Sequence, residues 1–97
     1  MRVFSKKVLR EFWIKHAETE QSLKTWYSET SKAKWKSPKD IKEEYVKASI
    51  VGDNRVVFNI CGNKYRLVVK FNYQQGWAFV RFIGTHKQYD KINVETI

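Results

Sequence analysis

The hydrophobic pattern of this chain changes near residue 48, and that change limits what the chain can fold into. Over 6–17, apolar residues recur every three or four positions and charged ones fill the other face, which predicts an amphipathic helix. A weaker pattern predicts a second helix over about 20–34. After residue 48, extended apolar runs are separated by turns that carry Gly with Asn, Asp or Gln. Helices followed by an antiparallel strand meander indicate an α+β fold, formed by one domain over 1–97.

Local signals mark where the helices begin. Ser5 precedes the first helical pattern and can cap it, and the short run 2–4 before it can pair as an edge strand. Further along, Ser37 is expected to accept an amide hydrogen bond as N-cap, and Pro38 needs no donor at the first helical position. Asp40 then sits in the positively polarised first turn. The sequence therefore predicts a third, short helix that begins at Pro38.

Positive charge is in excess along the whole chain. Nineteen Lys and Arg oppose ten Asp and Glu, which gives a net charge of +9. Residues 1–47 hold twelve basic and seven acidic side chains, and residues 48–97 hold seven and three, so the excess is not confined to a tail. This balance favours a polyanion as partner, RNA before a membrane, because no apolar run could anchor the chain. The alternative is a charged surface that serves only solubility.

The predicted strands place basic side chains on one face of the sheet. Between Lys64 and Phe71, one face is apolar, with Tyr65, Leu67, Val69 and Phe71. In the next strand, alternation gives an apolar face of Ala78, Val80 and Phe82, and an opposite face of Trp77, Phe79, Arg81 and Ile83. Arg66, Lys70 and Arg81 should therefore lie close together on the face that the helices leave open. No Asp or Glu occurs between Asp53 and Asp90, so this face either holds phosphates with bases stacked beside them or is an ordinary solvated surface.

The segment after the last strand contains the best candidate for acid–base chemistry. His86 lies two residues after Gly84, just past the predicted strand. Its ordinary pKa of about 6.5 lets it exchange a proton near neutral pH. If residues 86–90 form a helical turn, His86, Tyr89 and Asp90 share one side of it. Asp90 would then either orient the imidazole or only cap the turn. The other histidine, His16, lies near a helix end and is expected to cap carbonyl groups there.

Several other site types do not fit the residues present. Two His and one Cys, far apart in sequence, form no metal-ligand motif, and no Gly-rich phosphate loop or nucleophile turn occurs. Cys61 is alone, so no internal disulfide can form, and a reducing cytoplasm is the expected setting. We expect Cys61 to be a small core or turn residue. The first thirteen residues lack the apolar region of a secretory signal, and we expect neither a membrane segment nor a cofactor.

Four blocks of this sequence, at residues 57–60, 62–67, 81–86 and 89–90, closely resemble the HigB-type toxins of bacterial type II toxin–antitoxin modules. The last two blocks form the Arg-Phe-Ile-Gly-Thr-His and Tyr-Asp stretches around the candidate histidine. The resemblance is strongest over about 34–93 and looser over the first helices. It implies a RelE-like fold, in which an antiparallel sheet packs on N-terminal helices.

The resemblance also implies an activity and partners. HigB-type toxins of the RelE-like superfamily are mRNA interferases, endoribonucleases that cleave messenger RNA, commonly on the translating ribosome, and so inhibit translation. The implied partner is a HigA-like helix-turn-helix antitoxin, through which alone the toxin would meet operator DNA.

Four residues fall on HigB-type motif positions and are expected to be catalytic: Arg66, Arg81, His86 and Tyr89. The expected reaction needs no metal: the 2′-hydroxyl attacks its adjacent phosphate, with His86 as the acid and the two arginines on the phosphate oxygens. Lys70 is added as an RNA-binding residue from the face argument alone.

Further lysines are expected to bind the RNA backbone: Lys64, Lys87, Lys34 and Lys36, with others on the first two helices. Trp35 lies between two of them and either stacks on a base or packs in the core, and packing is favoured. Two rival functions remain open at this stage. One is a non-catalytic RNA-binding module, and the other is a protein-interaction domain whose basic face receives an acidic partner.

Overall fold

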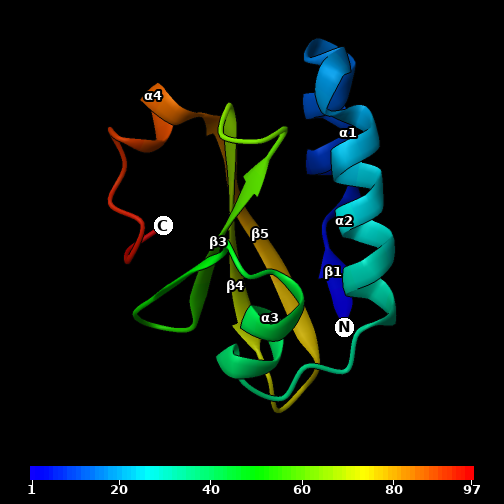
Figure 1. Ribbon diagram of the computed structural model, residues 1–97, viewed down its shortest axis with the longest axis vertical. Helices are drawn as coiled ribbons and strands as arrows, with labels where there is room; N and C mark the ends of the chain where they lie inside the picture. Colours follow the sequence, from blue (N-terminus) through cyan, green and yellow to red (C-terminus); the bar gives the residue numbers. More distant parts are fainter.

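The computed structural model describes residues 1–97, in which two long helices lie along one face of a five-stranded sheet (Figure 1). The elements in chain order are β1 (Arg2–Phe4), α1 (Lys6–Lys15), η1, a 3₁₀ turn (Ala17–Thr19), α2 (Glu20–Lys32), α3 (Pro38–Glu44), β2 (Ser49–Val51), β3 (Arg55–Ile60), β4 (Tyr65–Asn72), β5 (Trp77–Thr85) and α4 (His86–Tyr89). The helix α4 and the segment after it lie on the opposite side of the sheet from α1 and α2 (Figure 1). This is the predicted α+β architecture.

The helix starts follow the sequence signals with one exception. Ser5 caps α1, because its hydroxyl accepts a hydrogen bond from the Lys7 amide at 3.2 Å. Ser37 occupies the N-cap position of α3 as predicted, but its side chain makes no capping hydrogen bond. The Asp40 carboxylate instead accepts a hydrogen bond from the Lys36 amide at 2.9 Å, so this carboxylate ties down the start of α3.

The strand order is β1-β5-β4-β3-β2. Strands β2 to β5 form the predicted antiparallel meander, and β1 is an edge strand, as its length suggested. It pairs with β5 in parallel, with Arg2 opposite Trp77 and Phe4 opposite Phe79, so the sheet is mixed. The meander pattern alone did not predict this parallel pairing. No helix of the chain is long and apolar enough to cross a membrane.

The core lies between the sheet and the helices. Helix residues with at most 7% exposure meet the inward faces of the strands: Leu9, Trp13, Leu23 and Trp26 face Val56, Phe58, Leu67, Val69 and Phe71. Burial of each such side chain contributes about 1.5–3 kcal/mol. Trp35 is 4% exposed and its ring meets those of Tyr45 and Phe71 edge-on, so the prediction that Trp35 packs in the core is confirmed.

A bulge in β5 changes which side chains face the helices. Val68 pairs with Phe82 and Val69 pairs with Val80, which leaves Arg81 without a partner in β4. Because one extra residue reverses the alternation, Phe82 shares a face with Val68 while Ile83 shares a face with Leu67, on the helix side. The prediction that Phe82 faces the helices and Ile83 faces away is therefore wrong.

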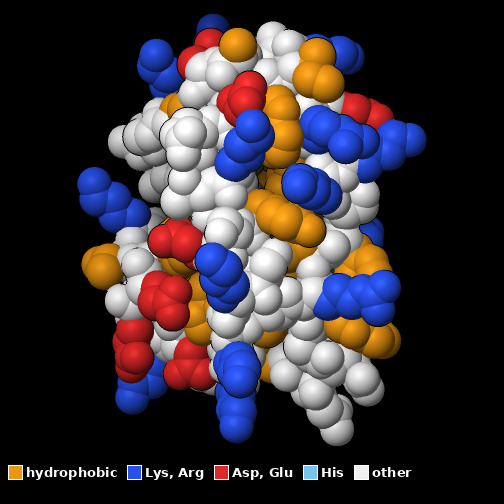
Figure 2. Space-filling view, turned by 90° about the vertical axis from the view of Figure 1, so that its right-hand side faces the viewer, with side chains coloured by type: hydrophobic (Ala, Val, Ile, Leu, Met, Phe, Trp, Pro, Cys, Tyr) orange, Lys and Arg blue, Asp and Glu red, His pale blue; other side chains and the backbone are white.

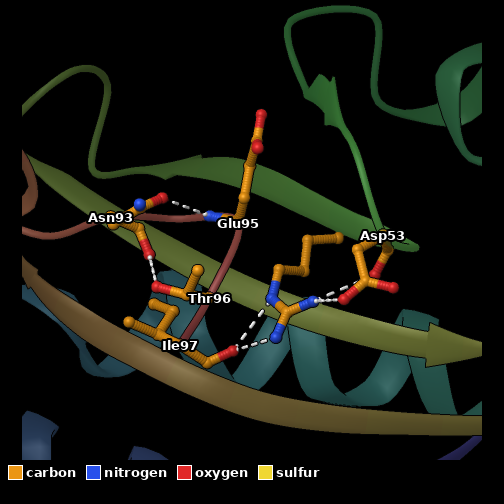
Figure 3. A network of polar contacts seen from close by, with 6 residues as sticks. Asp53, Asn93, Glu95, Thr96 and Ile97 are labelled. Carbon is orange, nitrogen blue, oxygen red and sulfur yellow. Dashed lines mark hydrogen bonds and ion pairs between the residues drawn. The ribbon is translucent and has the colours of Figure 1, made fainter.

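The face of the sheet away from the helices is partly covered by the end of the chain. Arg55 in β3 is 4% exposed, and its guanidinium donates hydrogen bonds through Nε and a terminal nitrogen to the main-chain oxygen of Ile97, at 2.8 Å for Nε (Figure 3). Its other terminal nitrogen lies 2.7 Å from the Asp53 carboxylate. On the same face, Val57 and Val68 are buried although neither belongs to the helix-side core. The segment after α4 thus shields a second, smaller apolar surface.

Candidate functional site

A short helix immediately after β5 fixes the position of His86. Thr85 is its N-cap: the Thr85 hydroxyl accepts a hydrogen bond from the Gln88 amide at 3.2 Å, and the Gln88 side chain accepts one from the Thr85 amide at 2.9 Å. The His86 amide donates to the Lys64 carbonyl at 3.2 Å, which ties the helix to the turn before β4. Backbone hydrogen bonds on both sides therefore hold this exposed residue in place.

The imidazole of His86 has a carboxylate partner. Its Nδ1 lies 3.1 Å from the Asp90 Oδ2, and both side chains are more than half exposed. Residues 86–89 do form a helical turn, with Asp90 as its C-cap, and this turn places Asp90 in contact with the ring. With Nδ1 bound, Nε2 is the nitrogen left for a substrate. Tyr89 lies half-buried on the same turn, with its ring centroid 6.5 Å from that of Phe82.

Arg66 lies at the same end of the sheet as His86. It is opposite Gly84 in the β4–β5 pair, two residues before the histidine. One of its terminal nitrogens donates to the carbonyls of Asn63 at 2.9 Å and Tyr65 at 3.3 Å. The guanidinium is thus held beside the β3–β4 turn. Arg66, His86 and Tyr89 are called the His86 corner below.

Gly84 is needed for the close packing of this corner. A Cβ at residue 84 would stand 2.6 Å from the Gln88 side-chain oxygen and 2.7 Å from the Phe82 ring. Both side chains therefore lie directly over the glycine. This is a physical reason for a glycine between Arg81 and His86.

Arg81 lies in a separate cleft on the same side of the sheet. The cleft has a volume of about 560 Å³ and is lined by polar, basic and aromatic residues: Asn54, Lys70, Phe71, Asn72, Tyr73, Gln74, Phe79 and Arg81. The bulge leaves Arg81 exposed, and Lys70 lines the cleft with it, as the face argument predicted. Neither Arg66 nor His86 lines it. Along β5, Arg81 and Gly84 are three residues, or about 10 Å, apart.

The five predicted site residues thus form two adjacent groups. The structure brings Arg66, His86 and Tyr89 together at one end of the sheet, and it brings Arg81 and Lys70 together in the neighbouring cleft. The guanidinium of Arg66 is bound to the β3–β4 turn, so Arg66, Lys70 and Arg81 do not meet at one point. A phosphodiester backbone that runs along the strands would pass both groups.

The lysines expected to bind RNA fall at both ends of the sheet. Lys64 and Lys87 flank the His86 corner and are exposed. Lys34 and Lys36 are exposed at the other end, where they line a shallow depression with the β4–β5 hairpin turn at 73–76. All four therefore lie at one end of the sheet or the other.

Charge on the open face is not neutralised. Arg66, Lys70 and Arg81 form no ion pair, whereas Asp53 is paired with Arg55 and Asp90 with His86. On the helix-covered face, acidic side chains lie among the basic ones in the upper part and gather at the lower left (Figure 2). There, Lys7 and Lys24 lie 3.8 and 2.5 Å from Glu11 and Glu20. The open face is the more suitable surface for a polyanion.

Tyr65 and His16 lie on the helix side of the sheet and belong to its packing. The Tyr65 hydroxyl donates to Glu18 at 2.9 Å, and this hydrogen bond, with burial and the charge of Glu18, raises the pKa of Tyr65. The His16 ring stacks on Phe12 and meets Tyr65, so His16 packs between rings at the end of α1. Cys61 lies in the β3–β4 turn with φ of 53°, and its thiol donates to the Glu18 carbonyl. No group of three His, Cys, Asp or Glu side chains is arranged to hold a metal ion.

Sequence reasoning missed the polar lining of the cleft. Asn54 and Gln74 indicated only turns, because turns and ligand-binding sites both use amide side chains, and Asn72 indicated only the end of a strand. It also missed the role of Arg55, which reads as an ordinary strand-end cation. The one signal for Arg55 was its position directly before the apolar run 56–58.

Residues 19–92 match the protein family described as HigB_toxin, the RelE-like toxic component of a toxin–antitoxin system. The match covers α2 and every later helix and strand, and it includes the cleft and the His86 corner. A comparison with curated proteins finds no match.

Proposed function

Because this chain belongs to the HigB family of RelE-like toxins of toxin–antitoxin systems, we propose that it is an endoribonuclease that cleaves messenger RNA in the cytoplasm. The observation that carries the proposal is the His86–Asp90 pair, 3.1 Å apart, at the end of a face on which Arg66, Lys70 and Arg81 lack carboxylate partners. An imidazole can move a proton near neutral pH, and unpaired cations attract phosphates.

The proposed reaction is a transfer within the RNA. The 2′-hydroxyl oxygen forms a bond to its adjacent phosphorus while the bond from phosphorus to the 5′ oxygen of the next nucleotide breaks. A base takes the 2′ proton and an acid protonates the departing oxygen, which leaves a cyclic phosphate and a 5′-hydroxyl. No metal takes part in these steps.

His86 is proposed as the acid. Asp90 holds Nδ1, which leaves Nε2 to face the substrate and donate a proton. General acid catalysis of this kind contributes about 10²–10⁴-fold to a rate. Tyr89, on the same turn, would orient the substrate, stack on a base or assist the proton transfer.

The arginines are proposed to stabilise the phosphate as charge builds on its oxygens. Arg81 is exposed and free of ion pairs, so it can reach a bound phosphate, and Arg66 would contribute once RNA replaces its carbonyl partners. Loss of one such donor costs about 2.7–4 kcal/mol of transition-state stabilisation. Lys70 would hold the backbone beside Arg81.

The partners follow the same proposal. The family implies an antitoxin, and we propose a HigA-like helix-turn-helix protein, through which alone operator DNA would be contacted. We also propose that the substrate is the message on a translating ribosome. If the ribosome orients the RNA, the isolated protein can cut free RNA slowly, because orientation is a large part of catalysis.

The test is induced expression of the wild type, His86→Ala, Arg81→Ala and a matched control, Arg10→Ala, in bacteria, followed by mapping of mRNA 5′ ends. Arg10 is exposed on α1, on the other side of the sheet, so its loss removes the same charge from outside the proposed site. We expect new 5′ ends and growth arrest with the wild type and Arg10→Ala. Cleavage should fall at least about 100-fold with either of the other two variants.

The rival functions predict different outcomes. A non-catalytic RNA-binding module would arrest growth with His86→Ala as strongly as with the wild type. A protein-interaction domain would show no salt-sensitive RNA binding. Either result, or an absence of new 5′ ends with the wild type, would overturn the proposal.

A further inference from the structure

Three aromatic side chains gather on the open face at the β1–β5 edge, away from the His86 corner. The rings of Phe4 and Phe79 stack with centroids 5.2 Å apart, and Trp77 meets them edge-on at 6.1 and 6.0 Å. Phe4 and Phe79 are opposite each other in the parallel strand pair, so both side chains project from the same face. These three residues are called the aromatic platform below.

The platform contains Trp77, the one aromatic side chain of the chain that is classed as exposed. Trp77 is 36% exposed, while the remaining tryptophans, Trp13, Trp26 and Trp35, are 2–7% exposed within the core. Phe4 and Phe79 are only half-buried. Grouped, exposed apolar rings have a cost in water, and on a small protein they commonly mark a binding surface.

Cations surround the platform and carboxylates do not. Lys70 is directly opposite Phe79 in the β4–β5 pair, Arg81 lines the same cleft as Phe79, and the Arg2 guanidinium lies 5.1 Å from the centre of the Phe4 ring. The three strands β1, β4 and β5 contain no Asp or Glu at all. The chemistry beside the rings is therefore suited to an anion.

The cleft next to the platform adds hydrogen-bonding groups. Its volume of about 560 Å³ lies within the range of about 300–1,000 Å³ that is usual for small-ligand sites. Asn54, Asn72 and Gln74 line it. The Asn72 side-chain oxygen accepts a hydrogen bond from the Gln75 backbone amide, which leaves the NH2 group of the Asn72 side chain free to donate. Rings, cations and amides together match the base, phosphate and polar edges of one nucleotide.

We propose that the aromatic platform and the adjacent cleft bind an unpaired nucleotide of single-stranded RNA. The base stacks on Trp77 or Phe79 and Lys70 holds its backbone, while Arg81 lies between this nucleotide and the His86 corner and keeps the role that the proposed function gives it. Stacking on a ring tolerates any base, so the site grips the RNA without strong sequence preference. An apolar protein segment would leave these cations without partners, which favours RNA as the occupant.

The nucleotide in this subsite is not the one that is cut. Phe79 and Gly84 are five residues, or about 17 Å, apart along β5. The platform would hold the RNA on one side of the scissile bond while the His86 corner acts on it. The inference rests on the proposed function in taking RNA as the ligand, but it requires binding only.

Trp77 itself provides the measurement. We would titrate the full chain with a short unstructured 2′-O-methyl RNA oligonucleotide, which lacks the attacking hydroxyl and cannot be cut. Quenching of tryptophan fluorescence by acrylamide would be recorded, with Trp77→Phe used to isolate the signal of Trp77. We expect bound RNA to shield Trp77 from acrylamide, and this readout needs no variant with a weakened fold.

Affinity for labelled RNA would then be measured by fluorescence anisotropy. Trp77→Ala and Phe79→Ala should each weaken binding about 5- to 140-fold, which corresponds to about 1–3 kcal/mol per stacked base. Trp77→Phe keeps a ring and should stay near the wild type. Ile14→Ala is the matched control, because Ile14 is 71% exposed on α1, on the opposite side of the sheet.

The outcomes separate this inference from the proposed function. RNA that binds without shielding Trp77, or binds the alanine variants as tightly as the wild type, overturns the subsite and leaves the catalytic proposal standing. Shielding of Trp77 in a protein that makes no cuts in cells supports the subsite and overturns the catalytic proposal. A protein that does not bind RNA at all overturns both, and an antitoxin that shields Trp77 when RNA does not would assign the platform to a protein partner.

Discussion

At the scale of single residues, the hydroxyl groups of two tyrosines differ in what they contribute to stability. The Tyr65 hydroxyl donates to Glu18 at 2.9 Å, while the Tyr73 hydroxyl is buried without a hydrogen-bond partner. A buried polar group without a partner loses its hydration and gains nothing in return. Tyr73 also packs its ring on Phe71, so the ring stabilises the fold and the hydroxyl does not.

We therefore expect opposite effects from the same change. Tyr73→Phe should leave the free energy of unfolding unchanged or raise it by up to about 1 kcal/mol, because it removes an unsatisfied group. Tyr65→Phe should lower it by about 0.5–1.5 kcal/mol, because it breaks a hydrogen bond. Urea denaturation at neutral pH measures both, and equal losses in the two variants would contradict the assignment.

The stability at alkaline pH provides a second test of the buried Tyr73 hydroxyl. Burial raises the pKa of Tyr73 to about 12, above the value of about 10 in an unfolded chain. The folded state thus keeps a proton that the unfolded state loses, so the contribution of Tyr73 to the free energy of unfolding is constant below about pH 10 and falls between about pH 10 and 12. Tyr73→Phe should make this fall shallower, and an unchanged slope would contradict a raised pKa for Tyr73.

At the scale of elements, the segment after α4 is the least regular part of the fold and depends on one anchor. The buried guanidinium of Arg55 binds the main-chain oxygen of Ile97 and the Asp53 carboxylate (Figure 3). Few other polar contacts join this segment to the sheet. Its attachment should therefore be sensitive to a single side chain.

Arg55→Ala is expected to release this segment. Loss of the hydrogen bonds of a charged group should lower the free energy of unfolding by about 1.5–3 kcal/mol and raise amide hydrogen exchange over 91–97. Asp53→Asn is the matched control, since Asp53 is 64% exposed and Asn tolerates its φ of 58°. That variant should lose less than about 1 kcal/mol. Equal exchange over 91–97 in Arg55→Ala and the wild type would show that the segment is held by other contacts.

The elements also show what the sequence could and could not predict. Periodicity and turn residues predicted the helices and the strands of the meander, because each depends on neighbours in the chain. Residue spacing also indicated that a helical turn, if formed, would bring Asp90 to the side of His86. The bulge at Arg81 could not be predicted, because it depends on the register between two strands and no glycine marks it. For the same reason the parallel pairing of β1, the anchor at Arg55 and the platform became visible only in the structure.

At the scale of the whole molecule, the net charge of +9 is arranged unequally. Lys6, Lys7 and Lys24 on α1 and α2 have carboxylate partners or lie over rings, whereas Arg66, Lys70 and Arg81 on the open face form no ion pair. Affinity for single-stranded RNA should therefore depend on a limited set of residues and fall steeply with salt.

Lys34 and Lys36 provide a test at this scale. The logarithm of the RNA association constant should fall linearly with the logarithm of salt concentration, by about 0.7 per phosphate neutralised. The double variant Lys34→Ala/Lys36→Ala should reduce this slope by about 1.4, if each lysine contacts one phosphate. Lys47→Ala, exposed just before β2 at the opposite edge of the sheet, should leave the slope unchanged. An unchanged slope in the double variant would remove these two lysines from the RNA surface.

The position of β5 has a consequence for how the protein folds during its synthesis. This strand is made last, yet it lies between β1 and β4 in the sheet, and its residue Trp77 pairs with Arg2, which was synthesised 75 residues earlier. Such distant pairing makes folding slow and leaves it incomplete while the nascent chain is growing. A polypeptide interrupted before β5 would contain both long helices but would lack Phe79 and Arg81. Under the proposed function, such a fragment would not cleave the surrounding transcripts.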